Sequence, residues 1–288
     1  MSRDRRVLAL QAARYACEVR RLARIPFDSA VCVYDLAEQA GIEVRFADLP
    51  SMEGVYYPAK PAIIVSSLRP QGRQAFTCAH ELGHHVYRHG EQFDELIEER
   101  GQGRTYDQKE YVADCFAGAL LMPKLAVMKG LSNRSLRAKH LAPEDVYRLA
   151  SWLGVGYTAL VNHLGRVLRL VSPEQAAALA KLRLPAIRKS LLGFDCSQHL
   201  IIADEAWSGR PIDADVSDLI MLPADATLEG AVLETLHRDQ KLCIARAAKP
   251  GIGRVLRPNT TWAHFTRVSR KQFIGMFRFR HLEEVDDE

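Results

Sequence analysis

The sequence lacks several features that would assign it to large classes of proteins. Its cysteines form no Cys-x-x-Cys pair, and no apolar run approaches the roughly 20 residues that a membrane-spanning helix needs. The first residues do not follow the pattern of a secretory signal peptide. We therefore expect a protein without a membrane span in a reducing, cytoplasmic setting. The six cysteines are scattered, at Cys17, Cys32, Cys78, Cys115, Cys196 and Cys243.

The composition also lacks an extreme of any kind. Hydrophobic residues make up 48% and charged residues 26% of the 288 residues, which is ordinary for a globular protein and leaves room for two or three domains. The run Gly251-Ile252-Gly253-Arg254 lacks the third glycine of a dinucleotide-binding loop. Any specific chemistry therefore has to come from local motifs.

One stretch, Ala79 to His85, holds such a motif. His80 and His84 stand four residues apart, which on a helix puts both imidazoles on one face, about 6 Å apart at their Cβ atoms. Glu81 lies about 100° round the same helix, so it can reach a metal-bound water without acting as a ligand. Helical periodicity from Gln71 to Tyr87 supports this geometry. The pattern is His-Glu-x-x-His, which favours zinc and hydrolysis with Glu81 as the catalytic base.

A third protein ligand decides the class of metal site. The longer zinc signature places a glycine and then a third histidine beyond the second, but those positions hold Tyr87 and Gly90. A second helix is predicted from Gln108 to a stop at Pro123, and Glu110 and Asp114 share one of its faces. Glu110 can complete a site of two histidines and one glutamate. Asp114 can accept the second ring N–H of a ligand histidine and fix its tautomer.

The sequence leaves alternatives open for these residues. The pattern His-Glu-x-x-His also occurs by chance on surface helices, and Glu110 with Asp114 could form the solvated edge of an amphipathic helix. His85 points about 100° away from His84 on a helix. We therefore place His85 and His89 outside the set of metal ligands, as surface groups or as groups that support a ligand.

Together the two motifs resemble the ImmA/IrrE family of zinc metallopeptidases. The resemblance covers about residues 5–125 and rests on Phe76 to His84, on Glu110-x-x-Ala113-Asp114-x-Phe116-Ala117 and on Leu120 to Pro123. It implies a zincin-like domain in a soluble intracellular endopeptidase. It also implies a substrate, a helix-turn-helix repressor whose cleavage releases a stress-response or mobile-element regulon. Many relatives carry Asn where this sequence has Asp114, but either residue can support a ligand histidine.

The residues before the metal motif are predicted to supply helices and part of a sheet. Strands are expected at residues 42–47, 54–57 and 62–66. In zinc peptidases with this order, one edge strand can hold an extended peptide by backbone pairing, and Ile63-Ile64-Val65 is our candidate for a strand of that sheet. Residues 3–24 are expected to form an arginine-rich amphipathic helix docked on this domain, with apolar residues at Val7, Leu10, Tyr15, Cys17 and Leu22.

The middle of the chain, from Lys124 to about Ser190, is basic and helical. A helix at 143–153, a turn at 154–156 and a helix at 157–164 give a helix-turn-helix pattern. Arginine and lysine far outnumber acidic residues in this segment, so DNA binding is possible. The second helix, however, offers no arginine or lysine before Arg166 to read base edges, only Tyr157, Thr158, Asn162 and His163. We therefore favour a scaffold or repressor-docking role.

The residues from about 193 onward lack helical periodicity and carry short strand candidates separated by turns. They predict a small β sandwich or barrel, by position a sensor or partner module. Trp207, Trp262 and His264 could line a pocket, but a role in the core is the simpler expectation. The predicted fold is α+β with three domains. These are a zincin-like metallopeptidase domain (1–123), a helix-turn-helix-like helical domain (124–192) and a β-rich C-terminal domain (193–288).

Two functions from different classes follow. The first is a zinc endopeptidase that hydrolyses a peptide bond in a helix-turn-helix repressor, and manganese or iron could occupy the same ligands. The second is a DNA-binding transcriptional regulator whose peptidase-like domain is not catalytic. We favour the enzyme because a degenerate domain would usually have lost one of its four key residues, and all are present: His80, Glu81, His84 and Glu110.

Overall fold

The computed structural model describes residues 3–90, 92–95 and 107–282, which form mixed α-helical and β-sheet structure. The predicted mixture of helices and sheets is thereby confirmed. The chain divides into two compact units. The N-terminal unit comprises Met1–Met128 together with Gln272–Arg278, and the C-terminal unit comprises Lys129–Lys271 together with Phe279–Glu288.

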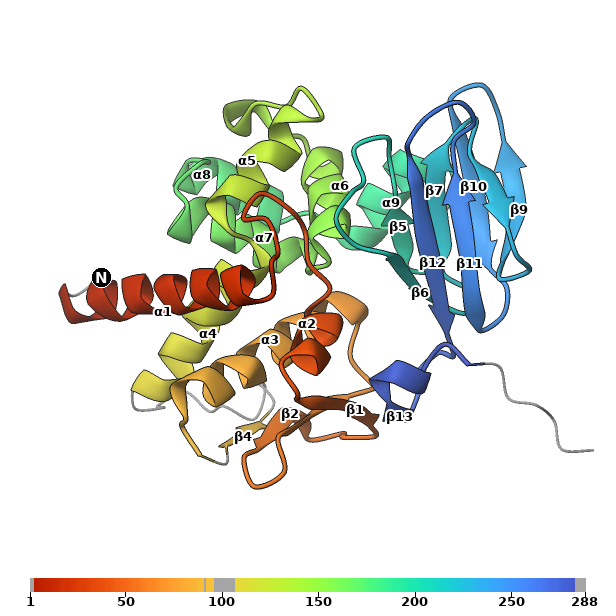
Figure 1. Ribbon diagram of the computed structural model, residues 1–288. Helices are drawn as coiled ribbons and strands as arrows, with labels where there is room; N and C mark the ends of the chain where they lie inside the picture. Colours follow the sequence, from red (N-terminus) through yellow and green to blue (C-terminus); the bar gives the residue numbers. More distant parts are fainter. Residues whose placement is uncertain (1–2, 91, 96–106, 283–288) are drawn as a thin grey trace, which may run out of the picture. The chain divides into compact units, whose positions relative to one another are not determined.

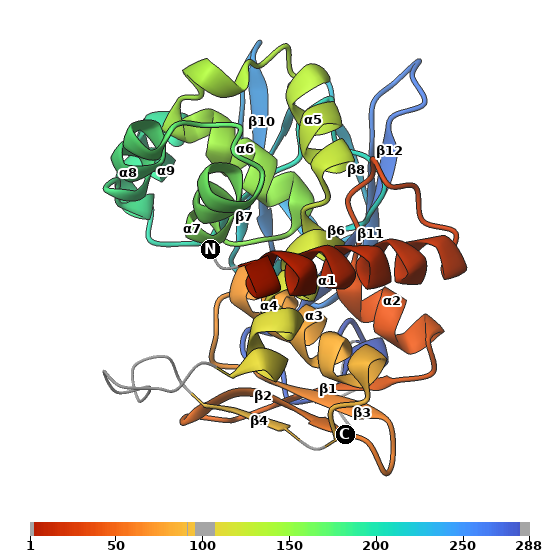
Figure 2. The same ribbon diagram turned by 90° about the vertical axis from the view of Figure 1, so that its left-hand side faces the viewer.

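A five-stranded sheet is the base of the N-terminal unit. β1 and β3 are parallel, and the other neighbouring strands are antiparallel. Helix α3 (Gln71–Tyr87) lies on β2 and β3 and packs against α4 (Gln108–Leu121), which in turn packs against α1 (Arg3–Leu22) (Figures 1 and 2). A short helix, α2 (Val33–Gln39), packs against α3 and β1. The spatial order of the strands is β13 (Gly275–Met276), β1 (Glu43–Ala47), β3 (Ala62–Ser66), β2 (Met52–Tyr57) and β4 (Gln92–Glu95).

Two glycines allow α3 to approach its neighbours closely. A Cβ atom at Gly54 on β2 would lie 2.5 Å from Thr77 Cγ2, so the helix can rest directly on the strand only if residue 54 has no side chain. A Cβ atom at Gly83 would lie 3.2 Å from Cα of Ala113 on α4. The absence of a side chain at Gly83 therefore lets α3 and α4 pack closely against each other.

Three local expectations differ from the structure. β3 lies between β1 and β2, so Ile63-Ile64-Val65 belongs to a central strand and has no free edge. The large apolar residues of α1 point outward, with Leu10 63% exposed, because the helix packs through Ala12, Ala16 and Arg20 instead. Gly90 is the residue that the sequence favours for closing helix α3, but the helix ends at Tyr87, because Arg88 takes the left-handed conformation (φ 54°, ψ 44°).

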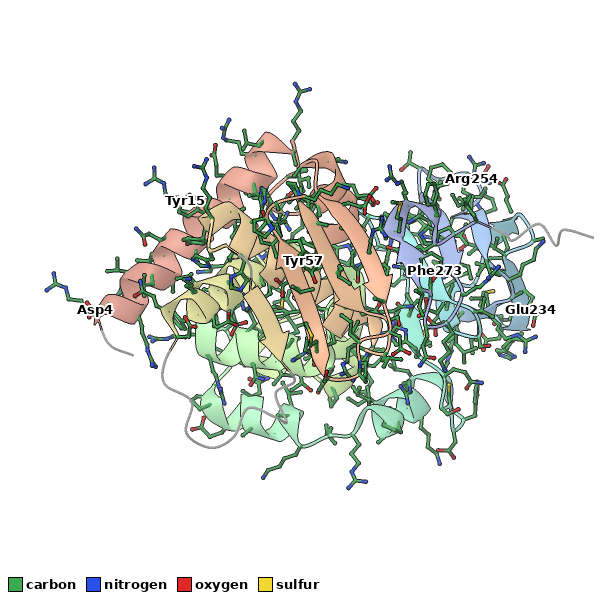
Figure 3. All side chains as sticks on the ribbon, turned by 90° about the horizontal axis from the view of Figure 1, so that it is seen from below. Asp4, Tyr15, Tyr57, Glu234, Arg254 and Phe273 are labelled. Atoms are coloured by element: carbon green, nitrogen blue, oxygen red, sulfur yellow. The ribbon has the colours of Figure 1, made fainter. Side chains whose placement is uncertain are left out.

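The last strand of the N-terminal sheet comes from the far end of the chain. Met276 pairs with Arg45 on β1, and Phe277 is buried with its ring centroid 5.0 Å from that of Tyr34. Phe273 lies beside the same sheet, whose face opposite α3 is seen in Figure 3. The sequence favours a strand at 273–279 as part of the C-terminal β-rich region, and this placement is wrong, because Gly275 and Met276 pair with β1 of the N-terminal sheet.

The C-terminal unit joins helices to two four-stranded sheets (Figure 1). Its helices follow α5 (Lys124–Ser132), which runs in from the N-terminal unit. They are α6 (Pro143–Leu153), α7 (Tyr157–Asn162) with a π-helical continuation (His163–Val167), α8 (Pro173–Ala180) and α9 (Leu184–Leu192). One sheet has the order β5 (Leu200–Ile202), β7 (Leu219–Pro223), β10 (Leu242–Ala247) and β9 (Leu233–Arg238), and the other has β6 (Ile212–Asp215), β12 (Ala263–Ser269), β11 (Gly251–Leu256) and β8 (Thr227–Glu229).

Hydrogen bonds connect the helical and β-rich parts of this unit. Tyr147 Oη donates to the Leu200 carbonyl over 2.9 Å, and Trp152 Nε1 donates to the Ser208 carbonyl over 2.9 Å. Arg134 forms a two-pronged ion pair with Asp204. Residues 129–192 and 193–271 therefore fold as one compact body, and the three-domain division stays a prediction.

The aromatic residues near the β sheets serve the core. Trp207 and Trp262 are buried, and their indole N–H groups donate to the carbonyls of Arg210 and Asp204. His264 lies edge-on to Trp262, with ring centroids 4.7 Å apart. These contacts agree with packing rather than with the pocket considered above.

One helical run is long and apolar enough to cross a membrane, judged by length and composition. This run, Gln108–Ser132, consists of α4 and α5, and 56% of its most apolar window is buried inside the structure. The sequence alone does not predict this run as a membrane span. A core helix passes the same test, and α4 has buried residues throughout its length, namely Val112, Ala113, Phe116, Ala117, Leu120 and Leu121.

Candidate metal centre

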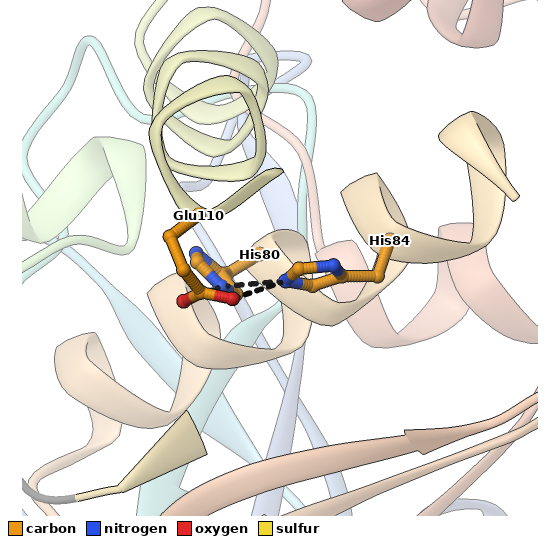
Figure 4. Close-up of side chains that lie close together, drawn as sticks. All are labelled: His80, His84 and Glu110. Atoms are coloured by element: carbon orange, nitrogen blue, oxygen red, sulfur yellow. Dashed lines mark hydrogen bonds and ion pairs between the residues drawn. The ribbon is translucent and has the colours of Figure 1, made fainter. Parts of the chain in front are cut away.

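Two packed helices bring the predicted ligands together. His80 and His84 project from the same face of α3, and their Nε2 atoms lie 2.9 Å apart. Glu110, in the first turn of α4, reaches toward both: its carboxylate oxygens lie 3.4 Å from His80 Nε2 and 3.4 Å from His84 Nε2 (Figure 4). The Asp107 side chain caps this helix by accepting from the Lys109 N–H, which fixes where α4 begins.

The donor set fits a divalent cation. One atom from each of His80, His84 and Glu110 lies within 4.8 Å of the others, and both histidines are buried. Tetrahedral zinc with bonds of about 2.0–2.1 Å separates its ligand atoms by about 3.3 Å, close to the spacings seen here. Two imidazoles and a carboxylate are also a donor set that zinc uses in catalytic sites. Among the described residues, this is the set of three that could hold a metal ion.

Asp114 lies where the sequence predicts it. Its Oδ1 is 2.9 Å from Nδ1 of His80, one helical turn beyond Glu110 on α4. When the His80 ring is neutral and its Nδ1–H donates a hydrogen bond to this carboxylate, Nε2 carries the lone pair and faces the cluster.

The two imidazoles differ in their proton affinity when no cation is bound. Burial alone would lower the pKa of His80, but its hydrogen bonds to Asp114 and Glu110 raise that pKa to about 10. Burial, reinforced by the neighbouring His80, lowers the pKa of His84 to about 4. The cluster therefore holds a proton on one imidazole, and a bound metal ion would take the place of that positive charge.

Glu81 is fully buried beside the cluster. Neither of its carboxylate oxygens has a hydrogen-bond partner among the residues that the structure describes. Burial raises the pKa of Glu81 to about 7; the charge of His80 opposes this rise and that of Glu110 adds to it. A buried carboxylate with open hydrogen-bonding capacity and a pKa near neutrality has the properties of a general base.

The structure adds one residue that sequence reasoning left out of the site. Nδ1 of His89 lies 3.0 Å from Nδ1 of His84, on the side away from the cluster. The sequence does place His89 only two residues after the end of α3. Helical spacing, however, cannot predict the direction in which the chain turns after the last residue of a helix. His85, by contrast, pairs its Nδ1 with the hydroxyl of Tyr56 on β2 over 2.7 Å.

Comparisons with known proteins agree with this centre. Residues 37–164 match the family model described as the IrrE N-terminal-like domain, and the span includes all five residues predicted for the site. The radiation response metalloprotease IrrE of Deinococcus radiodurans is 26% identical over 191 residues, which is 62% of this chain and 57% of that protein.

A similarity to a solved structure is weaker. A transcriptional regulator of Mycobacterium tuberculosis aligns with 61% of this chain and 50% of its own chain, at 19% identity and a TM-score of 0.37. That score is too low to bear on the fold or on the site. The sequence match and the domain match do not depend on it, and both support an IrrE-like metallopeptidase domain over residues 37–164.

Proposed function

We propose that the chain is a zinc-dependent endopeptidase that hydrolyses a peptide bond in a helix-turn-helix repressor. The observation that carries the proposal is the convergence of His80, His84 and Glu110 beside the unpartnered carboxylate of Glu81. Three protein ligands leave a fourth position open on a tetrahedral ion, as in catalytic zinc sites. The N-terminal unit would then be a zincin-like domain.

The roles of the side chains follow from their positions. A zinc ion held by His80, His84 and Glu110 would supply Lewis acidity and lower the pKa of water at the site. Glu81 would accept a proton from the attacking water and pass it to the amine nitrogen that leaves when the C–N bond breaks. Asp114 would hold His80 in the tautomer that leaves Nε2 free.

An extended substrate needs a free strand edge to pair with. β3 is central, so β4 at the end of the described sheet, next to β2, takes the place of the strand suggested by the sequence. A peptide added beside β4 would gain backbone hydrogen bonds, the usual mode of β-strand addition.

A repressor, rather than DNA, is the partner we propose for the helix-turn-helix-like region of α6 and α7. Of the four residues that could have read bases, Tyr157 and His163 are buried, and the Tyr157 hydroxyl donates to the Leu179 carbonyl. Only Thr158 and Asn162 of these four are exposed, and two such side chains provide few contacts for recognising bases. The family, and a relative named for its radiation response, support a stress-response regulon as the context, in the cytoplasm.

The direct test incubates the full chain with the repressor encoded beside its gene, with zinc or with a chelator, and identifies new termini by mass spectrometry. We expect one cut that needs the metal. Glu81→Gln should keep the metal yet cleave at least about a hundredfold more slowly, in the range for loss of a general base. Glu205→Gln, an exposed change on the C-terminal unit, is the matched control.

Two outcomes would count against the proposal. Equal cleavage by the parent and Glu81→Gln would remove Glu81 from the role of base. Tight, sequence-selective binding of duplex DNA by the zinc-loaded chain, with no cleavage of the repressor, would favour the transcriptional-regulator alternative.

A further inference from the structure

The two nitrogens of the His84 ring face different partners. Nε2 lies 2.9 Å from His80 Nε2 and faces the cluster, whereas Nδ1 lies 3.0 Å from Nδ1 of His89. We propose that His89 is a positioning residue that holds His84 in its metal-binding tautomer by accepting a hydrogen bond from the His84 Nδ1–H. This inference rests on the metal site of the proposed function.

The choice of tautomer is the reason that such a partner matters. A neutral imidazole has one N–H and one lone pair, so a histidine that binds a cation through Nε2 must carry its proton on Nδ1. His89 Nδ1 can accept that proton's hydrogen bond when its own proton is on Nε2. His89 therefore does for His84 what Asp114 does for His80, where the distance is 2.9 Å.

The end of α3 places His89 for this contact. On a continuing helix, residue 89 would point about 140° away from residue 84. The left-handed conformation of Arg88 ends the helix, and the His89 N–H then donates to the His84 carbonyl over 3.0 Å. Lys109 Nζ donates to the His89 carbonyl over 3.3 Å, which links the turn to α4.

Aromatic contacts hold the His89 ring in place. It stacks on Tyr87, with ring centroids 5.3 Å apart and an angle of 24° between the planes. Tyr87 in turn meets Tyr15 of α1 edge-on, at 4.9 Å. The imidazole is thus fixed from the backbone and from its face, so its Nδ1 meets His84 without a large loss of side-chain entropy at the moment of metal binding.

The chain offers a matched set of variants for a test. In asparagine, Oδ1 is bonded to Cγ just as Nδ1 is in histidine, so His89→Asn keeps an acceptor at nearly the same place. His89→Leu removes it while retaining bulk. His85→Leu removes a neighbouring imidazole whose Nδ1 pairs with Tyr56 instead of a ligand, and so serves as the control.

The measurement is the zinc affinity of the full chain, read by competition with a chromogenic chelator at fixed pH. Loss of a group that orients a ligand typically weakens metal binding about 10- to 100-fold, which we expect for His89→Leu. His89→Asn and His85→Leu should both stay within about threefold of the parent, because the acceptor or the ligand contact is retained.

Thermal unfolding separates positioning from a structural role. A structural role would lower the melting temperature of the chelator-treated protein, whereas we expect His89→Leu to unfold like the parent without zinc and to gain less on zinc addition. The inference is overturned if His89→Leu binds zinc as the parent does, or if His89→Asn is as weak as His89→Leu. A parent that binds no zinc, or an unchanged affinity in His84→Ala, would instead overturn the metal site itself.

Discussion

Buried charged side chains gather in both units, but they are arranged in opposite ways. In the C-terminal unit, the buried carboxylate of Asp213 accepts from Arg267 Nε over 2.6 Å and from Arg267 Nη2 over 3.0 Å, and Arg210 lies 3.8 Å away. In the N-terminal unit, the nearest atoms of His80, His84 and Glu110 are nitrogens and oxygens, each of which could serve as a metal ligand.

The difference separates a cluster of ion pairs from a candidate metal site. Burial alone would raise the pKa of Asp213, but Arg267, with Arg210 and Arg280, lowers it to about 2. The negative charge of Asp213 is thus balanced by the neighbouring arginines. For Glu81, burial dominates and raises the pKa to about 7. Burial of charged groups is therefore not enough to identify a metal site. A better indication is a group of converging acceptor atoms whose charges would be balanced only by an added cation.

The largest expected effect is the loss of metal from Glu110→Ala. If three protein ligands share a binding free energy of about 12 kcal/mol, removal of one weakens zinc binding about a thousandfold. Metal analysis and chelator competition measure this, with Asp213→Asn as the control. If Glu110→Ala bound zinc as tightly as the parent, Glu110 would not be a metal ligand, and the two clusters would not differ in the way described.

Asp213→Asn should have the opposite profile, with normal zinc binding and lower stability. It removes the buried carboxylate that pairs with Arg267, whose side chain is only 15% exposed, and this costs about 3 kcal/mol. The pKa of Asp213 is lowered on folding, so its stabilisation is complete above the ordinary pKa of about 3.9 and is lost as the pH falls toward 2. In denaturant unfolding, the free energy of unfolding of the parent should thus fall between about pH 4 and pH 2, and the variant should not show this fall.

A smaller effect is expected from Gly83→Ala, which tests how packing sets the ligand spacing. The new Cβ would lie 3.1 Å from Phe116 Cδ1 and 3.2 Å from Ala113 Cα, so α4 would have to move by a few tenths of an ångström. Overpacking of about 1–3 kcal/mol is partly offset by about 1 kcal/mol of helix propensity. We expect modestly lower stability and zinc binding about tenfold weaker, because Glu110 moves with α4.

Gly156→Ala is the control for that change. Residue 156 has an ordinary φ of −68°, and a Cβ atom there meets nothing within 4 Å. If both alanines had the same effect on zinc affinity, the contact between α3 and α4 would not be what sets the distance between the ligands.

The smallest effect concerns the basic surface of the C-terminal unit. Arg166→Ala combined with Arg169→Ala should raise the KM for the whole repressor several-fold and leave cleavage of a short peptide across the cut unchanged, since exposed charges add little individually. Kinetics on both substrates measure this. A steeply salt-dependent affinity for duplex DNA that the double substitution abolishes would point to nucleic acid as the partner instead.

The elements of the site were predictable because their signals are local. The helix predicted at 71–87 is α3, and the helix predicted from Gln108 ends at Leu121, two residues before Pro123. Spacing along these helices is enough to put His80 with His84 and Glu110 with Asp114. That the two pairs meet was inferred from the chemistry of metal ligands, not from periodicity.

The missed features depend on contacts between distant residues. The guanidinium of Arg20 is buried and donates to the Leu120 and Pro26 carbonyls, so a charged residue occupies a position where α1 would be expected to bury an apolar one. Strands β8 and β9 carry mostly exposed, polar residues and show no alternation that would have revealed them. The contact between His84 and His89 depends on a single left-handed residue.

The strand β13 has a consequence for how this protein can be divided. The chain leaves the N-terminal unit after residue 128, returns to it for residues 272–278 and leaves again, so three crossings connect the two units. If the chain is cut at one of these three connections, the other two still join the two units. The N-terminal unit is therefore not a contiguous piece of the sequence: a fragment that ends at residue 128 lacks the strand that pairs with β1 and the Phe277 ring that packs on Tyr34. A single breakpoint in the sequence cannot separate this unit intact from the C-terminal unit.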